Sequence, residues 1–162
     1  MLLRRPALLV AAALVGVALV VPAAEAGAGD VAAIRTVAAR YTLATTNGSP
    51  EACQLATPNV QQTLAYFASG LLKTTKPMSC PAAVKALAKY NASKYPSGRQ
   101  AYVRSGEAAA RAIARGKVTI HGTKATLAYT LLVQDTQGKS SLSFSSEVYV
   151  ALVHGRWLID TG

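Results

Sequence analysis

The fold is decided by residues 117–160, KVTIHGTKATLAYTLLVQDTQGKSSLSFSSEVYVALVHGRWLID. Apolar and polar residues alternate in four runs over this stretch, beginning at Val118 and Ile120. Such alternation is typical of a strand with one buried face. Three short segments of turn composition separate the runs: His121-Gly122-Thr123, residues 136–139 and His154-Gly155-Arg156. The stretch therefore predicts a four-stranded antiparallel meander.

A sheet of this kind needs a cover for its apolar face, and the remaining apolar surface belongs to predicted helices that precede it. Start and stop signals predict helices over residues 30–47, from Ser49, from Thr57, from Cys80 and over residues 107–115. We expect Asp30 to cap the first helix, and the helix from Thr57 to bury Val60, Leu64 and Phe67. The fold class is therefore α+β, with N-terminal helices packed on an antiparallel sheet of about four strands.

Residues 1–26 have the composition of an export signal. Arg4 and Arg5 are followed by an apolar run over residues 7–21, and Ala24-Glu25-Ala26 is a small-x-small cleavage pattern. Cleavage after Ala26 leaves residues 27–162 as a single secreted domain. The alternative is an uncleaved membrane anchor, because the apolar run with its flanks approaches the roughly 20 residues that span a bilayer. Pro22 and the cleavage pattern favour cleavage.

The chain beyond residue 26 is strongly basic, with 15 basic and 6 acidic residues and hence a net charge of +9. An exported basic protein meets anionic wall polymers, acidic polysaccharides and lipid head groups before it meets nucleic acid. We therefore expect an anionic envelope polymer or an apolar small molecule as the partner, and no nucleic acid. A membrane is expected only if the signal segment is retained.

The two cysteines, Cys53 and Cys80, predict one disulfide bond in an oxidising compartment. The bond would close a loop of 28 residues. The alternative is a reactive thiol at Cys80, which precedes Pro81 at a predicted helix start where a thiolate is favoured. No C-x-x-C motif and no neighbouring histidine accompany it, which favours the structural bond.

A basic segment with interleaved tyrosines runs from residue 85 to residue 117. Its one acid is Glu107. Its cations are Lys85, Lys89, Lys94, Arg99, Arg104, Arg111, Arg115 and Lys117, and its aromatic residues are Tyr90, Tyr95 and Tyr102. Aromatic faces beside cations suit a polyanion or acidic-glycan site, for which we select Lys94, Tyr95, Arg99, Tyr102 and Arg104. The alternative is a solvated basic face that keeps the protein soluble.

Three pieces of sequence together carry a family resemblance: SPEACQL over residues 49–55 with a second cysteine about a helix later, VTIHGTKATL over 118–127, and HGRWLID over 154–160. They resemble secreted actinobacterial members of the nuclear transport factor 2-like superfamily, which includes SnoaL-type and ketosteroid-isomerase-type cones. The resemblance covers nearly all of residues 27–162. It implies a curved sheet wrapped around a helix to form a conical pocket, but no particular reaction, because this fold hosts enzymes and binding modules alike.

The alternation of the strands predicts which residues would line such a cone. The candidates for the ligand pocket are Tyr129, Phe144, Ser146 and Trp157 on an otherwise apolar inner face. We expect Trp157 and Phe144, however, to belong to a filled core between sheet and helices, and a ligand-stacking role for Trp157 is the alternative. In a filled core, alanine in place of either would cost about 3–5 kcal/mol.

A catalytic cone would need a carboxylate base inside the pocket. Alternation places Glu147 on the outer face with Ser143, Ser145 and Tyr149. A single β-bulge would turn Glu147 and Tyr149 inward, and they would then join Tyr129 as the catalytic residues of an isomerase, hydrolyase or cyclase.

No cofactor or metal is expected, because the two histidines, His121 and His154, stand beside glycines at predicted turns. The sequence thus favours an exported, non-enzymatic binding or accessory module of the cell envelope. The enzyme remains the alternative function.

Overall fold

The computed structural model of the chain describes residues 27–134 and 141–162, and for residues 133, 134, 141 and 142 it describes the backbone alone. The predicted signal segment and the predicted turn at 136–139 lie outside the described residues. The helices are α1 (Ala28–Asn47), α2 (Glu51–Gln54), α3 (Pro58–Leu71), α4 (Cys80–Lys94) and α5 (Gly98–Ile113). The strands are β1 (Lys117–His121), β2 (Lys124–Gln134), β3 (Ser141–Val153) and β4 (Arg156–Asp160).

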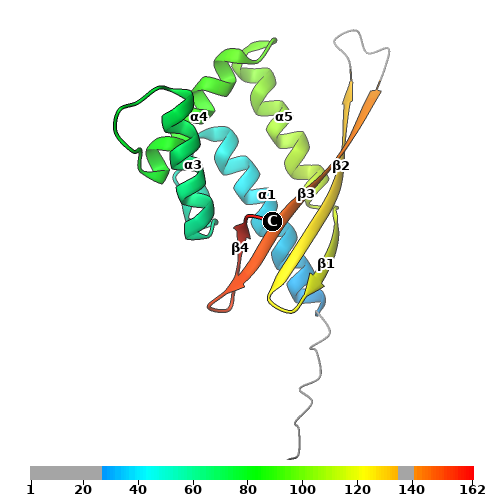
Figure 1. Ribbon diagram of the computed structural model, residues 1–162. Helices are drawn as coiled ribbons and strands as arrows, with labels where there is room; N and C mark the ends of the chain where they lie inside the picture. The colour runs from blue at the N-terminus through cyan, green and yellow to red at the C-terminus, as the bar shows by residue number, and fades with distance from the viewer. Residues whose placement is uncertain (1–26, 135–140) are drawn as a thin grey trace, which may run out of the picture.

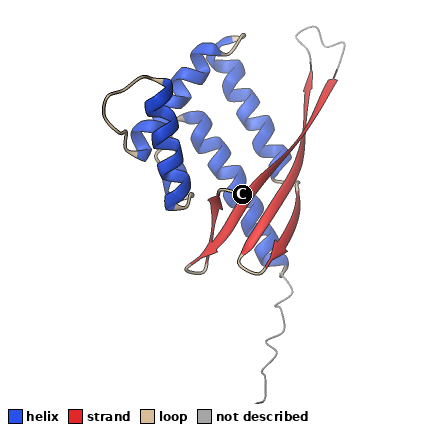
Figure 2. Cartoon of the chain, viewed as in Figure 1, coloured by secondary structure: helices blue, strands red, loops and turns tan. Residues whose placement is uncertain are grey.

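The described elements form three layers. The sheet stands on one side, α1 and α5 lie beside it, and α3 and α4 lie on the far side of those two helices (Figure 1). All helices precede all strands along the chain, and Figure 2 shows the two classes segregated in space. The predicted α+β class with helices on a four-stranded antiparallel sheet is confirmed.

The sheet has the strand order β1-β2-β3-β4, as a meander must. The β2–β3 register runs without interruption from Lys124 opposite Ala151 to Gln134 opposite Ser141. Because no residue is inserted, no β-bulge shifts the alternation over this range. Tight turns at residues 122–123 and 154–155 join β1 to β2 and β3 to β4, as predicted. His154 and Gly155 both adopt positive φ there, and the glycine does so without steric cost.

The outer edge of β4 is paired with the segment that follows α2. The amide of Ile159 donates to the carbonyl of Leu55 at 2.8 Å, and the amide of Thr57 donates to the carbonyl of Ile159 at 2.8 Å. Thr57 also caps α3 through its side chain, as predicted, and its hydroxyl donates to Asp160 at 3.0 Å. This pairing protects part of an edge that would otherwise be open.

The main core lies between α1 and the inner face of the sheet. Ile34, Ile113, Leu127 and Val150 are at most 1% exposed, and Trp157 is 8% exposed in the same cluster. The indole Nε1 of Trp157 donates to the carboxylate of Asp30 at 2.9 Å. The prediction of Trp157 as a core anchor is therefore confirmed.

Two predictions about aromatic residues and one about a cap are wrong. Phe144 is 53% exposed and Phe67 is 60% exposed. Phe144 lies on the inner face of the hairpin at a point where no helix covers it, and α3 buries Val60 and Ala68 instead of Phe67. Asp30 does not cap α1, since the helix begins two residues earlier and the carboxylate is used to hold β4.

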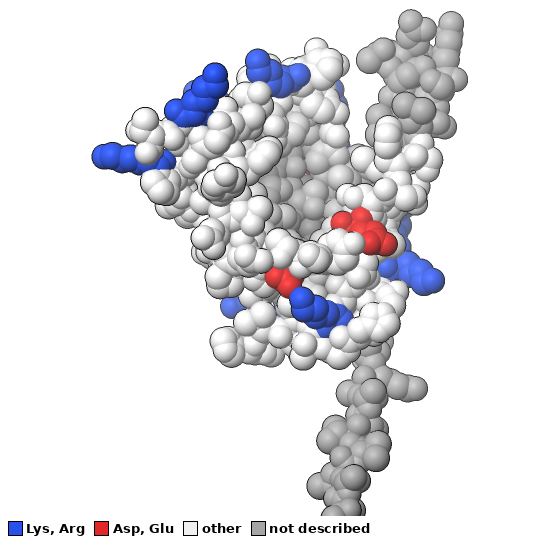
Figure 3. Space-filling model, viewed as in Figure 1, with Lys and Arg blue, Asp and Glu red and all other residues white. Residues whose placement is uncertain are grey.

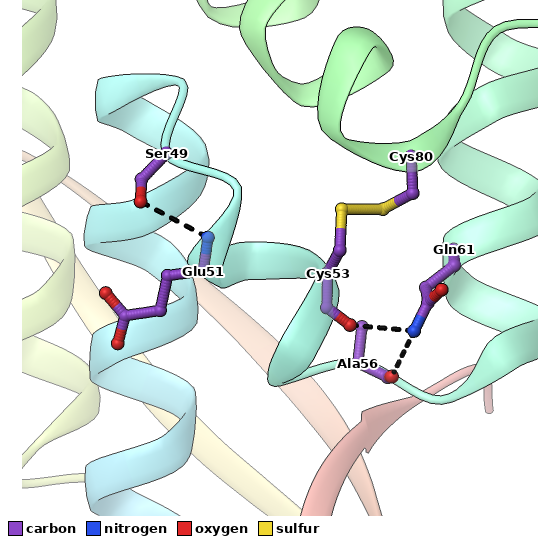
Figure 4. The surroundings of a disulfide bond; sticks show 6 residues. All are labelled: Ser49, Glu51, Cys53, Ala56, Gln61 and Cys80. Atoms are coloured by element: carbon purple, nitrogen blue, oxygen red, sulfur yellow. Dashed lines mark hydrogen bonds between the residues drawn. A yellow bond between two sulfur atoms is a disulfide. The ribbon is translucent and has the colours of Figure 1, made fainter.

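A disulfide joins α2 to the start of α4, between Cys53 and Cys80, as predicted (Figure 4). The side-chain amide of Gln61 on α3 donates to the carbonyls of Cys53 at 2.7 Å and Ala56 at 3.1 Å. Both cysteines are buried. The bond and these hydrogen bonds together fix the short α2 helix against α3 and α4.

The last helix is longer than predicted. The sequence favoured a helix from Glu107, whereas α5 begins at Gly98 and includes Arg99, Tyr102 and Arg104. Residues 95–97 connect α4 to α5. Within the described residues no helix is long and apolar enough to cross a membrane.

Candidate anion-binding site

Two glycines allow three helices to converge at the end of α1. Gly48 ends α1 in the left-handed conformation, and a β-carbon there would lie 3.2 Å from the side chain of Ala88 and 3.3 Å from the backbone of Lys85. On α5, a β-carbon at Gly106 would lie 2.3 Å from the hydroxyl oxygen of Thr46. Any larger residue at either position would push α4 or α5 away from α1.

The convergence leaves a cleft of about 280 Å³, which we call the α4–α5 cleft. Lys85 and Lys89 line it from α4, Arg99 and Tyr102 line it from α5, and residues 46–48 close it at the end of α1. Ala88, Ala92 and Val103 supply its apolar surface. The cleft therefore combines three cations, one aromatic ring and the polar end of α1.

The charge in the α4–α5 cleft is unbalanced. Its lining contains no aspartate or glutamate. The ion pairs among the described residues are Arg40 with Glu51 and Lys124 with Asp160, so none of the three cleft cations is neutralised by a carboxylate there. Lys85 and Lys89 stand one helical turn apart, where like charges repel by a few tenths of a kcal/mol. A bound anion would relieve this repulsion.

The structure separates the five residues that the sequence selected for polyanion binding. Arg99 and Tyr102 line the cleft. The ring of Tyr95 packs against that of Tyr102, with centroids 5.8 Å apart, and so supports it from outside. Lys94 lies over the ring of Tyr90 at 5.7 Å, and Arg104 is exposed on α5 away from the cleft lining.

The sequence selection missed Lys85, Lys89 and the end of α1 as cleft residues. The signal for the two lysines was their spacing of four on a predicted helix, which places both on one face. Nothing in the local sequence indicated that residues 46–48 would meet that face.

Two of the four residues predicted for the cone pocket, Tyr129 and Ser146, line a second, larger cavity of about 690 Å³. Tyr129, Ser146 and Glu147 line it with Arg115 and Lys117. Figure 3 shows the molecule hollowed between the helices and the β2–β3 hairpin, with basic side chains on the helices and also on the strand side. Phe144 and Trp157 are not among its lining residues, because Trp157 is in the core and Phe144 lies further along the hairpin.

The candidate catalytic residues do not converge as a cone active site would require. The uninterrupted register keeps Glu147 and Tyr149 on the face opposite to Tyr129, as the alternation predicted. The Tyr149 hydroxyl donates to the Glu147 carboxylate at 2.9 Å, and both side chains are exposed. This hydrogen bond, with the negative charge of Glu147, raises the pKa of Tyr149.

No group of three or more histidine, cysteine, aspartate or glutamate side chains that could hold a metal ion occurs in the described part of the chain. His121 and His154 are both exposed beside their turns.

Replacing Gly106 by alanine should lower the free energy of unfolding by about 1–3 kcal/mol, because the added methyl group overlaps Thr46. Gly70 on α3 is the matched control, since nothing lies within 4 Å of a β-carbon there. Gly70→Ala should be neutral or stabilising by up to about 1 kcal/mol, because alanine favours a helix over glycine. Urea unfolding measures both, and equal effects would contradict the close approach of α1 and α5.

Comparisons of the chain with family models, with curated proteins and with solved structures gave no match.

Proposed function

We propose that this protein is an exported, non-enzymatic binding module of the cell envelope that takes an anionic polymer at the α4–α5 cleft. The observation that carries the proposal is the set of three cations, Lys85, Lys89 and Arg99, around one cleft without a carboxylate. Cations held in this way attract and position anionic groups. Membership of the nuclear transport factor 2-like superfamily is part of the proposal and rests on the sequence resemblance and the α+β fold.

Export is supported by two independent features. Residues 1–26 carry the signal-peptide pattern, and the Cys53–Cys80 bond is typical of proteins in oxidising compartments. In that location the abundant polyanions are wall polymers and acidic polysaccharides, so an envelope polymer suits the cleft better than nucleic acid. The polymer is expected to bind along the helical half, where Lys94 on α4 and Arg104 on α5 are exposed cations outside the cleft lining.

Charge reversal tests the proposed function. The probe is poly(glycerol phosphate), and the variant carries Lys85→Glu, Lys89→Glu and Arg99→Glu. Each cation near a polyanionic surface contributes on the order of 1 kcal/mol, so we expect affinity to fall by at least about 100-fold. Affinity of the unaltered protein should also fall steeply as salt rises, because exposed charges are screened. Calorimetric titration at several salt concentrations measures both effects.

The control variant reverses three exposed cations elsewhere: Lys73→Glu, Lys76→Glu and Arg156→Glu. It has the same net charge as the test variant. Circular dichroism of both variants should show the helix and strand content of the unaltered protein, as a check that they are folded. Equal weakening by both sets would mean that the attraction belongs to the overall charge and not to the cleft, and the proposed site would be wrong.

A small-molecule isomerase, hydrolyase or cyclase is the second candidate function. The observation in its favour is that Tyr129 and Glu147 both line the 690 Å³ cavity. Such an enzyme would have to reach Glu147 from the outer face or the edge of the hairpin, because the register holds its side chain away from Tyr129. A small molecule that co-purifies with the native protein and is lost in Glu147→Gln would favour this function over polymer binding.

A further inference from the structure

The carbonyl groups at the end of α1 give the α4–α5 cleft a second chemical character. A helix leaves its last carbonyls without partners inside the helix. The amide of Gly48 turns back to Thr45, and that of Ser49 turns back to Ala44. The carbonyls of Thr46, Asn47 and Gly48, which all belong to residues lining the cleft, are not reached by these bonds.

The next residues along the chain do not supply partners either. Residue 50 is a proline, which has no amide hydrogen to offer to the carbonyl of Thr46. The amide of Glu51 points to the hydroxyl of Ser49 at 3.3 Å (Figure 4), and the amide of Ala52 points to the carbonyl of Ser49 at 3.2 Å. Within the described residues, the end of α1 therefore leaves backbone acceptors without partners at residues that line the same cleft as the three cations.

These two sets of groups require different features of one ligand. Lys85, Lys89 and Arg99 donate to an anionic group, and their combined charge suits one that carries close to two negative charges, such as a phosphate monoester. The free carbonyls accept hydrogen bonds and repel a second anion, because the end of a helix is the negative end of its dipole. They suit hydroxyl groups.

The remaining surface of the cleft suits a compact ring. Tyr102 presents an aromatic ring braced by Tyr95, and Ala88 and Ala92 are small and apolar. The C–H face of a sugar packs well against such a surface. The volume of about 280 Å³ is just below the roughly 300–1,000 Å³ of pockets for drug-sized ligands, so it suits one sugar unit.

We infer that the α4–α5 cleft binds a single phosphorylated sugar, with the phosphate on Lys85, Lys89 and Arg99 and the hydroxyl groups on the carbonyls that end α1. The inference rests on the proposed function, of which it specifies the ligand: the cleft recognises a sugar that carries a phosphate monoester at the end or on a branch of an anionic chain, and the basic surface around it holds the rest of that chain.

Calorimetric titration of the oxidised protein with glucose 6-phosphate, inorganic phosphate and glucose tests this inference. Glucose 6-phosphate should bind at least about tenfold more tightly than inorganic phosphate, since only the sugar uses the carbonyls and the ring. Glucose alone should bind more weakly than either. The triple charge reversal should abolish binding of both phosphates.

A substitution of Tyr102 distinguishes the contribution of the sugar contacts from that of the phosphate-binding cations. Tyr102→Leu keeps an apolar side chain of moderate size but loses the flat face, so affinity for glucose 6-phosphate should fall by about tenfold while affinity for inorganic phosphate stays unchanged. Tyr66→Leu is the matched control, because Tyr66 is 83% exposed on α3 and outside the cleft. It should change neither affinity.

The outcomes separate this inference from the proposed function. Equal affinity for glucose 6-phosphate and inorganic phosphate would overturn the inference, and so would sugar-phosphate binding that survives the triple charge reversal. In both cases cleft-dependent binding of poly(glycerol phosphate) would still uphold the proposed function. Tight binding of glucose 6-phosphate without binding of poly(glycerol phosphate) would uphold the sugar-phosphate site and would overturn polymer binding as the proposed function. If none of these probes binds, both the inference and the proposed function are overturned.

Discussion

Replacement of Trp157 by alanine is expected to lower the free energy of unfolding by about 3–5 kcal/mol, the range for large aromatic residues removed from a core. Trp157 is 8% exposed and packs in the cluster that joins α1 to the sheet. Its indole also donates to Asp30 at 2.9 Å, so the substitution removes both the packing and the link between the first turn of α1 and β4. Urea unfolding of the purified protein provides the measurement.

Two further variants show how much of the loss in unfolding free energy comes from packing and how much from the hydrogen bond to Asp30. Trp157→Phe keeps most of the ring volume but cannot donate to Asp30, so it should cost less than the alanine variant. Phe144→Ala is the control for an aromatic residue on the same sheet face, and it should cost clearly less because Phe144 is 53% exposed. If Trp157→Ala unfolds at the same urea concentration as the unaltered protein, the indole does not belong to the core.

Removal of the Cys53–Cys80 bond should have an effect of similar size. The bond closes a loop between residues separated by 27 positions, and in the chain-entropy model a loop of this length stabilises the fold by about 3–4 kcal/mol. That is a large part of the roughly 5–15 kcal/mol that holds a small domain together. The melting temperature of a Cys53→Ala, Cys80→Ala protein should therefore fall markedly.

Intact mass and thiol labelling provide the control for this prediction. The native protein should weigh two hydrogens less than its reduced form and should offer no thiol to an alkylating reagent. Two readily alkylated thiols in the freshly isolated native protein would support instead the reactive Cys80 that the helix start also permits. The mass should further correspond to a chain beginning at Gly27.

The helical part of the sequence was predicted less well than the strands, and α5 shows why. Glycines at positions 98 and 106 and the serines near them weaken the local helical signal, so a helix was expected only from Glu107. In the structure α5 packs along α1, and the glycine at 106 is what permits the close approach to Thr46. Tertiary packing thus favours a helix where local propensity alone does not.

The candidate site was likewise predicted only where the signal is local in the sequence. The sequence indicated a basic, tyrosine-containing segment, and two of its five selected residues, Arg99 and Tyr102, line the cleft. The spacing of four between Lys85 and Lys89 would have allowed these two lysines to be included among the selected binding residues. The end of α1 could not have been found in this way, because its contact with α4 and α5 joins segments about 40 to 60 residues apart and depends on the two glycines.

The sequence by itself determined the order of the elements, the pairing of the strands, the faces of the sheet and the pairing of the cysteines. These features follow from a period of two, short turns and the number of cysteines, all of which are local or countable. Only the tertiary structure decided how far the helices cover the sheet, so that Trp157 is buried while Phe144 is exposed. It also decided that cations from α4 and α5 meet the carbonyl end of α1, because close packing between distant segments depends on shape in three dimensions and not on any pattern along the chain.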